Sequence, residues 1–309
     1  ILATVLGVAA VVLGIIALVK RQSPKGASIT GLVSGVIAFF TAIVVGAVGA
    51  FTIFAGLIGI GLDSELGGGQ ASEGEQWVPD TPAEALLEWP SNMASGGIIF
   101  AFDGTGPMPV PSSPLEAGTA PVPNAVDREN GVDVLIYVDY RCPHCLSFEQ
   151  ANGQLLDLAL AEGATVEIVP LSFLDRVDES SYYSSRAAGA MACIADSQPE
   201  AAWFAHQSLL SPEVQPNSGP GLSNSDLISV LDQGVGGLNA QAVDCIESER
   251  FVTFAQALNS WVFATTVPNA VDPSIRVQGT PMALVNGVPY EGDPADAAAF
   301  GAFFLEQIN

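Results

Sequence analysis

The charge of this 309-residue chain excludes two classes of partner. It carries 33 acidic against nine basic side chains, a formal net charge of −24, so nucleic acid and anionic lipid surfaces would repel it. All the acidic residues follow position 62; a solubilising surface is the simpler interpretation, and an acidic docking face for a basic partner is the alternative.

Two long apolar segments at the start of the chain predict membrane spans. The first, ILATVLGVAAVVLGIIALV, ends at Lys20 and Arg21, and the second runs from about Ile29 to Leu62. Each exceeds the roughly 18 apolar residues that indicate a spanning helix. Small residues recur along the second segment, which would let two helices pack closely. We therefore expect residues 1–62 to form a two-helix membrane anchor rather than a cleaved signal peptide.

The loop KRQSPKG between these segments predicts their orientation. Its three cations should stay in the cytoplasm, because positively charged loops are retained on that side. Everything after Leu62 would then lie on the extracytoplasmic side of the cell membrane. Such a compartment is oxidising and permits stable disulfides.

The next segments are irregular. Residues 63–97 are polar and rich in Gly, Glu and Pro, which predicts a flexible acidic linker. The apolar run Ile98–Phe102 predicts a short strand. Segment 107–123 contains too many prolines for a regular element and predicts an extended loop.

The remaining segments predict an α/β domain. VDVLIYVDY, from Val132, has the pattern of a buried strand; helical spacing follows it, and ATVEIVPLSF predicts a second strand. A long Ala-rich helical region, about residues 178–268, precedes a hairpin with Asn286-Gly287 at its turn and an amphipathic helix at the C-terminus. This order fits a mixed sheet covered by helices, with the helical region as an insertion.

The motif CPHC stands where the first of these strands meets the helix. Cys142 would lie at the helix N-terminus, where free amides and the helix dipole favour a thiolate. Pro143 suits the first helical turn because it has no N–H to lose, and His144 is placed to stabilise the thiolate. Cys145, one turn further, would close the disulfide. These residues predict a redox-active pair.

Two other roles for this cysteine pair are possible from its spacing. A zinc site needs four ligands, whereas the other cysteines and the second histidine are dispersed along the chain, so we expect no metal. An inert disulfide between adjacent helical turns would close too short a loop to contribute much stability.

The motif also carries a family resemblance. CPHC after a hydrophobic strand resembles the thioredoxin superfamily, and its Pro-His dipeptide resembles the DsbA-like thiol:disulfide oxidoreductases. VQGTPMALVNG resembles the superfamily's second landmark, in which a cis-proline lies beside the active-site disulfide; Thr280 and Pro281 match it. The resemblance covers about residues 132–309. It implies a thioredoxin fold with a helical insertion, over residues 98–309.

The resemblance also implies roles for individual residues. Thr280 and Pro281 would bind substrate through the backbone. Glu149, seven residues after Cys142, matches an acidic position near the buried cysteine, and Asp139 lies three residues before Cys142. Both are candidates for proton transfer, the alternatives being a solvated helix residue and a polar strand end. The position six before Cys142, acidic in some members, is Ile136 here.

Two further cysteines and a histidine fall in the helical region. Relatives of actinobacterial type carry a second disulfide there, so the resemblance implies a structural disulfide between Cys193 and Cys245. Two unpaired core thiols are the alternative. His206, on an apolar helix without a second ligand nearby, is expected to be a packed or capping histidine.

The resemblance implies a function. We expect a membrane-anchored oxidoreductase that introduces disulfides into unfolded exported proteins, needs no cofactor, and is re-oxidised by a quinone-linked membrane partner. A reductase or isomerase of the same fold, and a non-catalytic accessory subunit of a larger membrane complex, are the alternatives.

Overall fold

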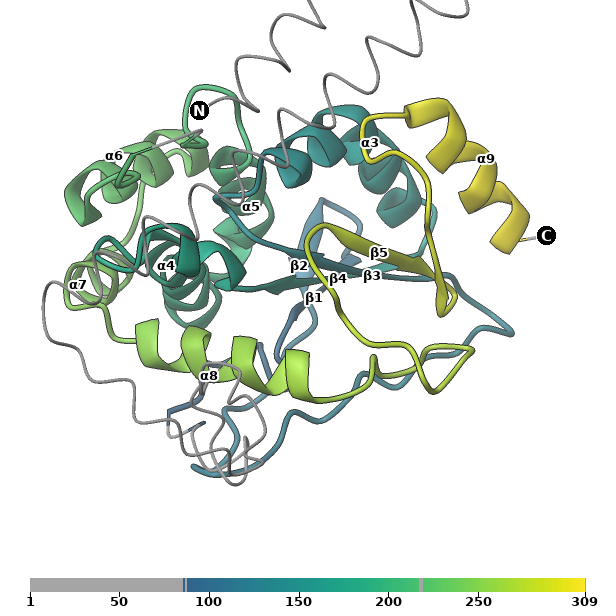
Figure 1. The fold of residues 1–309 in the computed structure, drawn as a ribbon, viewed down its shortest axis with the longest axis horizontal. Helices are drawn as coiled ribbons and strands as arrows, with labels where there is room; N and C mark the ends of the chain where they lie inside the picture. Colours follow the sequence, from purple (N-terminus) through teal and green to yellow (C-terminus); the bar gives the residue numbers. More distant parts are fainter. Residues whose placement is uncertain (1–85, 87, 217–218, 309) are drawn as a thin grey trace, which may run out of the picture. The chain divides into compact units, whose positions relative to one another are not determined.

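The computed structural model describes residues 86, 88–216 and 219–308. These residues form a six-stranded mixed sheet, in the order β2-β1-β4-β3-β5-β6, covered by helices. Figure 1 shows the sheet nearly edge-on, with α3 and α9 on one side of it, α8 on the other, and α4 to α7 gathered at one end. The predicted α/β class with a mixed sheet is confirmed.

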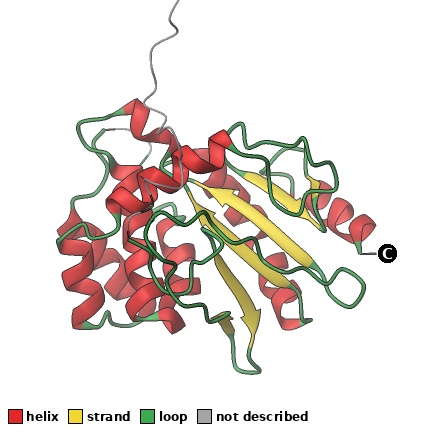
Figure 2. Cartoon of the chain, turned by 90° about the horizontal axis from the view of Figure 1, so that it is seen from below, coloured by secondary structure: helices red, strands yellow, loops and turns green. Residues whose placement is uncertain are grey.

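Strand β3 holds the centre of the sheet and leads directly into the CPHC motif. It pairs in parallel with β4 and antiparallel with β5, while β1 runs antiparallel to β4. Most of its side chains are buried on both faces, which explains its continuous apolar sequence. Figure 2 shows the strands between the helices. The strands are β1 (Ile98–Phe102), β2 (Pro107–Pro109), β3 (Asp133–Val138), β4 (Thr165–Pro170), β5 (Met282–Val285) and β6 (Val288–Pro289).

Five helices lie between β4 and β5 in the chain and form a helical block, α4 to α8. Helix α4 is its centre, because it contacts α5, α7 and α8 and is buried over most of its length. The helices are α3 (Pro143–Ala161), α4 (Tyr183–Ser197), α5 (Ala202–Leu209), α6 (Asn224–Val235), α7 (Ala240–Glu247), α8 (Val252–Ala264) and α9 (Ala297–Gln307), with short 3₁₀ turns η2 (Phe173–Val177) and η3 (Pro199–Ala201).

The predicted membrane spans, residues 1–62, and most of the predicted linker lie outside the described residues. Within the ranges given above, no helix is both long and apolar enough to cross a membrane.

The described residues at the end of the predicted linker, 86 and 88–97, belong to the folded domain, so the prediction does not hold there. Leu86, Trp89 and Met93 are buried in the core, and Trp89 packs edge-to-face on Phe254 of α8. These apolar residues are widely spaced among Gly, Ser and Pro and show no periodicity. Phe254, which packs on Trp89, belongs to a helix far along the chain, so local pattern could not reveal this contact.

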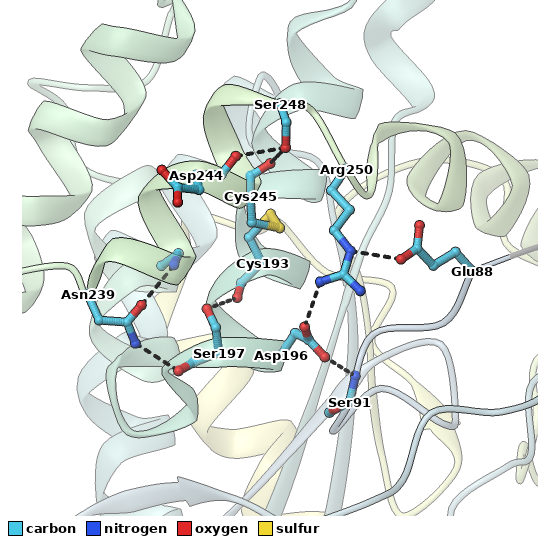
Figure 3. Close-up of a disulfide and its surroundings, with 11 residues drawn as sticks. Glu88, Ser91, Cys193, Asp196, Ser197, Asn239, Asp244, Cys245, Ser248 and Arg250 are labelled. Carbon is cyan, nitrogen blue, oxygen red and sulfur yellow. Dashed lines mark hydrogen bonds and ion pairs between the residues drawn. A yellow bond between two sulfur atoms is a disulfide. The ribbon is translucent and has the colours of Figure 1, made fainter.

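Hydrogen bonds and ion pairs fasten this segment to the helical block beside a disulfide (Figure 3). Arg250 Nε donates to Glu88 Oε1 at 2.7 Å, and Arg250 Nη1 donates to Asp196 Oδ2 at 3.2 Å. The Ser91 N–H donates to Asp196 Oδ1 at 2.9 Å. Because Arg250 is about half exposed, its ion pairs contribute little by themselves; burial of the neighbouring apolar side chains provides most of the attachment.

A short strand interrupts the segment predicted as an extended proline-rich loop. Residues Pro107–Pro109 form β2, which pairs with β1 at the edge of the sheet. Proline lacks the N–H that a central strand must donate on both sides, but an edge strand tolerates the loss. The prediction was wrong here because it judged the prolines without knowing that they lie at an edge.

Glu167 is the acidic residue of β4, a strand that is apolar apart from Glu167 and Thr165. Its carboxyl group occupies the space beside Gly97, where a Cβ would come within 2.7 Å of Oε1. Burial raises the pKa of this carboxyl to about 7; the charge of Asp133 adds to the rise and a hydrogen bond with Ser95 opposes it. An unfolded chain ionises Glu167 near 4.5. Raising the pH from about 4.5 to about 7 therefore removes stability from the folded state.

Replacing Glu167 with Gln should stabilise the chain at pH 8 and leave its stability at pH 4 nearly unchanged. The amide has no charge to bury, whereas the carboxyl is ionised only at the higher pH. Urea unfolding midpoints at both pH values measure the effect. Glu162→Gln, at the exposed end of α3, is the control and should change neither midpoint. An equal gain at pH 4 and pH 8 would contradict the titration argument.

Candidate active site

Cys142 is the N-cap residue of α3, and Pro143 occupies the first helical turn. The Cys142 thiol donates to the Thr280 carbonyl oxygen at 3.2 Å. Cys142 is 5% exposed, while Pro143 and His144 are exposed. The first cysteine therefore lies at the edge of the protein interior, with its sulfur directed to the segment that contains Thr280.

Cys145 lies one turn further along α3 and is 1% exposed. Its sulfur accepts from the Asp139 N–H at 3.5 Å. Both cysteines of the CPHC motif are free thiols in this structure. The pair is thus asymmetric, with one sulfur near the surface and one fully enclosed.

The surroundings give the two thiols opposite acidities. A hydrogen bond from the Cys145 thiol lowers the pKa of Cys142 to about 6, and the backbone N–H groups of Cys145 and His144 act in the same direction, while burial opposes them. Burial raises the pKa of Cys145, and a thiolate at Cys142 raises it further. At neutral pH Cys142 is therefore the thiolate and nucleophile of the pair, and Cys145 is a protonated thiol.

The segment opposite Cys142 contains Thr280 and Pro281, joined by a cis peptide bond. It leads directly into β5, which pairs with β3. Thr280 is partly exposed and lies beside the reactive sulfur. The structure therefore brings the two sequence landmarks, 138 residues apart, into hydrogen-bonding contact.

Asp139 is fully buried between the active-site loop and the helical block. Its Oδ1 accepts from the Arg141 N–H at 2.8 Å and from Ser184 Oγ of α4 at 2.7 Å, and its Oδ2 accepts from the Leu174 N–H of η2 at 2.8 Å. Burial raises the pKa of Asp139 to about 7, the charge of Cys142 adds to the rise, and the three hydrogen bonds oppose it. A carboxyl that titrates near neutral pH thus lies beside the buried thiol.

Glu149 lies one turn beyond Cys145 on the same helix and contacts His206 of α5. The distance from Glu149 Oε2 to His206 Nε2 is 3.4 Å, and His206 Nδ1 lies 3.1 Å from the Tyr140 hydroxyl. His206 is 1% exposed. It is a packed histidine, as expected, but it is packed between two residues of the active-site segment.

Local sequence gave no signal for several residues around the cysteines. Leu174, Ser184 and His206 reach the site from η2, α4 and α5, and Tyr140 falls in a segment that predicts only a strand. Cys193 of α4 and Cys245 of α7 form a disulfide, apart from the CPHC pair. Ile136, at the position that is acidic in some relatives, is buried in β3. In the described ranges, no cluster of His, Cys, Asp or Glu is arranged to hold a metal ion.

A comparison with protein families matches residues 127–302 to the thioredoxin family. The match covers more than half of the chain. The chain belongs to the thioredoxin family. Within this family fold, the CPHC motif at the end of β3 and the Thr280–Pro281 bond before β5 face each other. A comparison with curated protein sequences gave no match.

Solved structures similar to this thioredoxin-family chain include a protein described as a disulfide bond oxidoreductase, DsbG. Oxidised DsbA of Mycobacterium tuberculosis is 25% identical, with a TM-score of 0.50, over 69% of this chain and 93% of its own. DsbG of the same organism, in reduced form, is 29% identical with a TM-score of 0.48, over 58% and 78% of the two chains. BdbD of Bacillus subtilis is 16% identical with a TM-score of 0.48, over 71% and 96%.

Proposed function

We propose that this chain is a thiol:disulfide oxidoreductase of DsbA type that introduces disulfides into exported proteins. The observation that carries the proposal is the asymmetric CPHC pair: Cys142 has a lowered pKa and faces Thr280, and Cys145 is enclosed. The likeness to DsbA of Mycobacterium tuberculosis supports the same chemistry.

The proposed reaction begins with the enzyme disulfide. A substrate thiolate attacks Cys142 Sγ, the Cys142–Cys145 bond breaks, and Cys145 leaves as a thiolate that takes up a proton. A second thiolate of the substrate attacks the substrate sulfur of the mixed disulfide and releases Cys142 as a thiolate. The substrate loses two electrons and gains a disulfide, and the enzyme becomes a dithiol. A quinone-linked membrane oxidant would then accept the two electrons.

We infer that Thr280 aligns the substrate during this exchange. In the dithiol the Thr280 carbonyl oxygen accepts from Cys142, and this hydrogen bond is lost when Cys142 becomes a thiolate or joins a substrate sulfur. The carbonyl is then free to accept from a substrate backbone N–H, as in strand-like peptide recognition. Pro281 has no N–H that would compete for the same contact.

Asp139 is the better placed of the two candidate proton carriers for Cys145. Its backbone N–H already contacts the Cys145 sulfur, and its carboxyl titrates near neutral pH because it is buried. A group with a pKa near the working pH can both donate and accept a proton. We propose that it protonates Cys145 when the disulfide opens and deprotonates it when the disulfide closes.

Replacing Asp139 with Asn should slow closure of the Cys142–Cys145 disulfide by roughly 100-fold at pH 7, because it removes the general base. Closure can be followed by stopped flow after Cys142 has formed a mixed disulfide with glutathione. The wild-type rate should rise with pH through an inflection near 7, and the variant should lack it. Asp175→Asn is the control, since Asp175 also joins η2 to α4, through Ser185, but hydrogen-bonds to neither cysteine. An unchanged inflection would refute this role.

The direction of electron flow is tested by the reduction potential of the full chain, equilibrated with glutathione buffers. A stabilised Cys142 thiolate favours the reduced enzyme and makes the disulfide oxidising. We expect a value near about −120 mV, typical of DsbA; a value near about −270 mV, typical of thioredoxin, would indicate a reductase instead. The Cys193→Ser/Cys245→Ser variant should give the same value, which assigns the potential to the CPHC pair.

We also propose that residues 1–62 anchor the domain on the extracytoplasmic side of the membrane. The positive loop KRQSPKG and the disulfide-permitting environment that Cys193 and Cys245 require support this orientation. Protease added to intact cells should release the domain by cutting upstream of Leu86, and complete protection would place it inside.

A further inference from the structure

His206 is a buried imidazole that contacts two polar groups of the active-site segment. Tyr140 lies two residues before Cys142, and Glu149 lies one helical turn after Cys145. Tyr140 and His206 are fully buried, and the Glu149 side chain is 10% exposed. In the part of the chain that the structure describes, the ion-pair partner of the Glu149 carboxylate is His206.

This arrangement lets the imidazole gain or lose a proton without moving. When His206 is neutral, its Nδ1 accepts from the Tyr140 hydroxyl, and its Nε2 lies 3.4 Å from the Glu149 carboxylate. When His206 is charged, its Nδ1–H donates to the Tyr140 oxygen instead, because a hydroxyl serves either as donor or as acceptor. Both protonation states therefore keep the contacts of His206 with Tyr140 and Glu149.

Gly153 leaves space for the Glu149 carboxylate beside helix α3. It lies inside α3, where glycine is unfavourable, one turn after Glu149. A Cβ at this position would lie 2.6 Å from Glu149 Oε1. The missing side chain leaves room for the carboxylate to stay inside, against His206.

The charges near the imidazole connect it with the cysteines. Burial raises the pKa of Tyr140, and the charges of Glu149 and Cys145 raise it further, so the Tyr140 hydroxyl is close to both groups; Tyr183 and Asp139 act on it in the same way. On its own helix, His206 packs on Trp203, whose indole N–H donates to Asp157 of α3. In the described ranges, α4, α6, β2 and η3, which carries Glu200, also pack against α5 but place no hydrogen-bonding side chain on His206.

We propose that His206 is a positioning residue that holds a proton beside the Glu149 carboxylate. The proton sets the net charge of the His206–Glu149 pair, one helical turn from Cys145. Whether His206 carries this proton depends on the redox state of the CPHC pair. This inference rests on the proposed function, because it requires Cys142 and Cys145 to alternate between disulfide and dithiol. A protonated His206 neutralises Glu149 and favours the Cys142 thiolate. By reciprocity, formation of that thiolate must favour protonation of His206.

The test is an NMR titration of the histidine side chains in the purified full chain, oxidised and reduced. The chain contains two histidines, His144 and His206, and the His206→Asn variant assigns the signals. We expect the titration midpoint of His206 to be higher in the reduced chain, by on the order of half a pH unit. Equal midpoints in both redox states, or no titration of His206 between about pH 4 and 9, would overturn the proposal.

Controls separate this coupling from other effects. In the Cys142→Ser/Cys145→Ser variant the midpoint of His206 should not respond to the same reductant. A response that persists there comes from the Cys193–Cys245 disulfide and also overturns the proposal. Failure of the wild-type pair to form any disulfide would instead contradict the proposed function. The two failures are therefore distinguishable.

Two substitutions test the pairing itself. Glu149→Gln removes the anion, and Gly153→Ala displaces it without removing a polar group, so both should lower the midpoint of His206. Gly301→Ala is the matched control, because Gly301 lies in α9 with open space where its Cβ would be. The proposal fails when neither Glu149→Gln nor Gly153→Ala shifts the midpoint.

Discussion

Replacing Cys145 with Ser should leave covalent adducts of substrate on Cys142, whereas replacing Cys142 with Ser should leave none and reduce turnover to background. The lowered pKa makes Cys142 the attacking thiolate, and the raised pKa and burial of Cys145 restrict it to the intramolecular step. Without Cys145, a mixed disulfide formed by Cys142 has no internal thiol to break it. The adducts are measured as mass-shifted bands on non-reducing gels, which vanish on reduction.

The double variant Cys142→Ser/Cys145→Ser is the matched control for this experiment. It retains the Cys193–Cys245 disulfide, so any adduct that it forms reports exchange at that second site. Equal trapping by the two single variants would contradict the assigned roles, because it would mean that the enclosed sulfur reacts with substrate as readily as the one at the helix N-terminus.

Removing the Cys193–Cys245 disulfide should cost about 4 kcal/mol of stability. The bond joins α4 to α7 across 52 residues and restricts the unfolded chain. Both sulfurs are buried, and the bond holds the helical block beside the attachment of residues 86–97. Urea unfolding of the Cys193→Ser/Cys245→Ser variant, compared with the wild-type pair, gives the difference.

This comparison is best made in chains that also carry Cys142→Ser and Cys145→Ser. The disulfide under test is then the sole remaining cysteine pair of the chain. Adding reductant to the chain that retains Cys193 and Cys245 should bring its unfolding midpoint to that of the variant without them. A loss below about 1 kcal/mol would show that the denatured chain is compact enough to lose little entropy on cross-linking.

The elements that carry the reactive sulfurs could be predicted because their signals are local. Three signals each act over a few residues: an apolar run typical of a buried strand, a proline at the first helical turn, and an Asn-Gly hairpin turn. The structure has β3, α3 and the β5–β6 turn at these places. Thr280 and Pro281 were recognised by resemblance, since nothing in their spacing places them opposite Cys142. The structure supplies that contact.

The surroundings of the cysteines could not be predicted, because they depend on pairings between distant segments. The sequence alone identifies Asp139 as a polar residue at a strand end. The structure adds the hydrogen bonds that its carboxylate accepts from Ser184 and Leu174. The sequence predicts a packed histidine at His206, and the structure shows that its polar neighbours are Tyr140 and Glu149. Leu86, Trp89 and Met93 lack any periodicity that would mark them as core residues.

Under the proposed anchoring by residues 1–62, helix α4 has a mechanical consequence for the domain. Its first turn binds the carboxylate of Asp139 through Ser184, and its last turn binds the N-terminal segment through Asp196, about 18 Å further along the helix axis. A pull on the chain upstream of Leu86 therefore loads the far end of α4, where Cys193 shares the strain with α7 through Cys245. The Cys193–Cys245 bond thus spreads such traction over two helices, at the end of α4 away from Ser184 and Asp139.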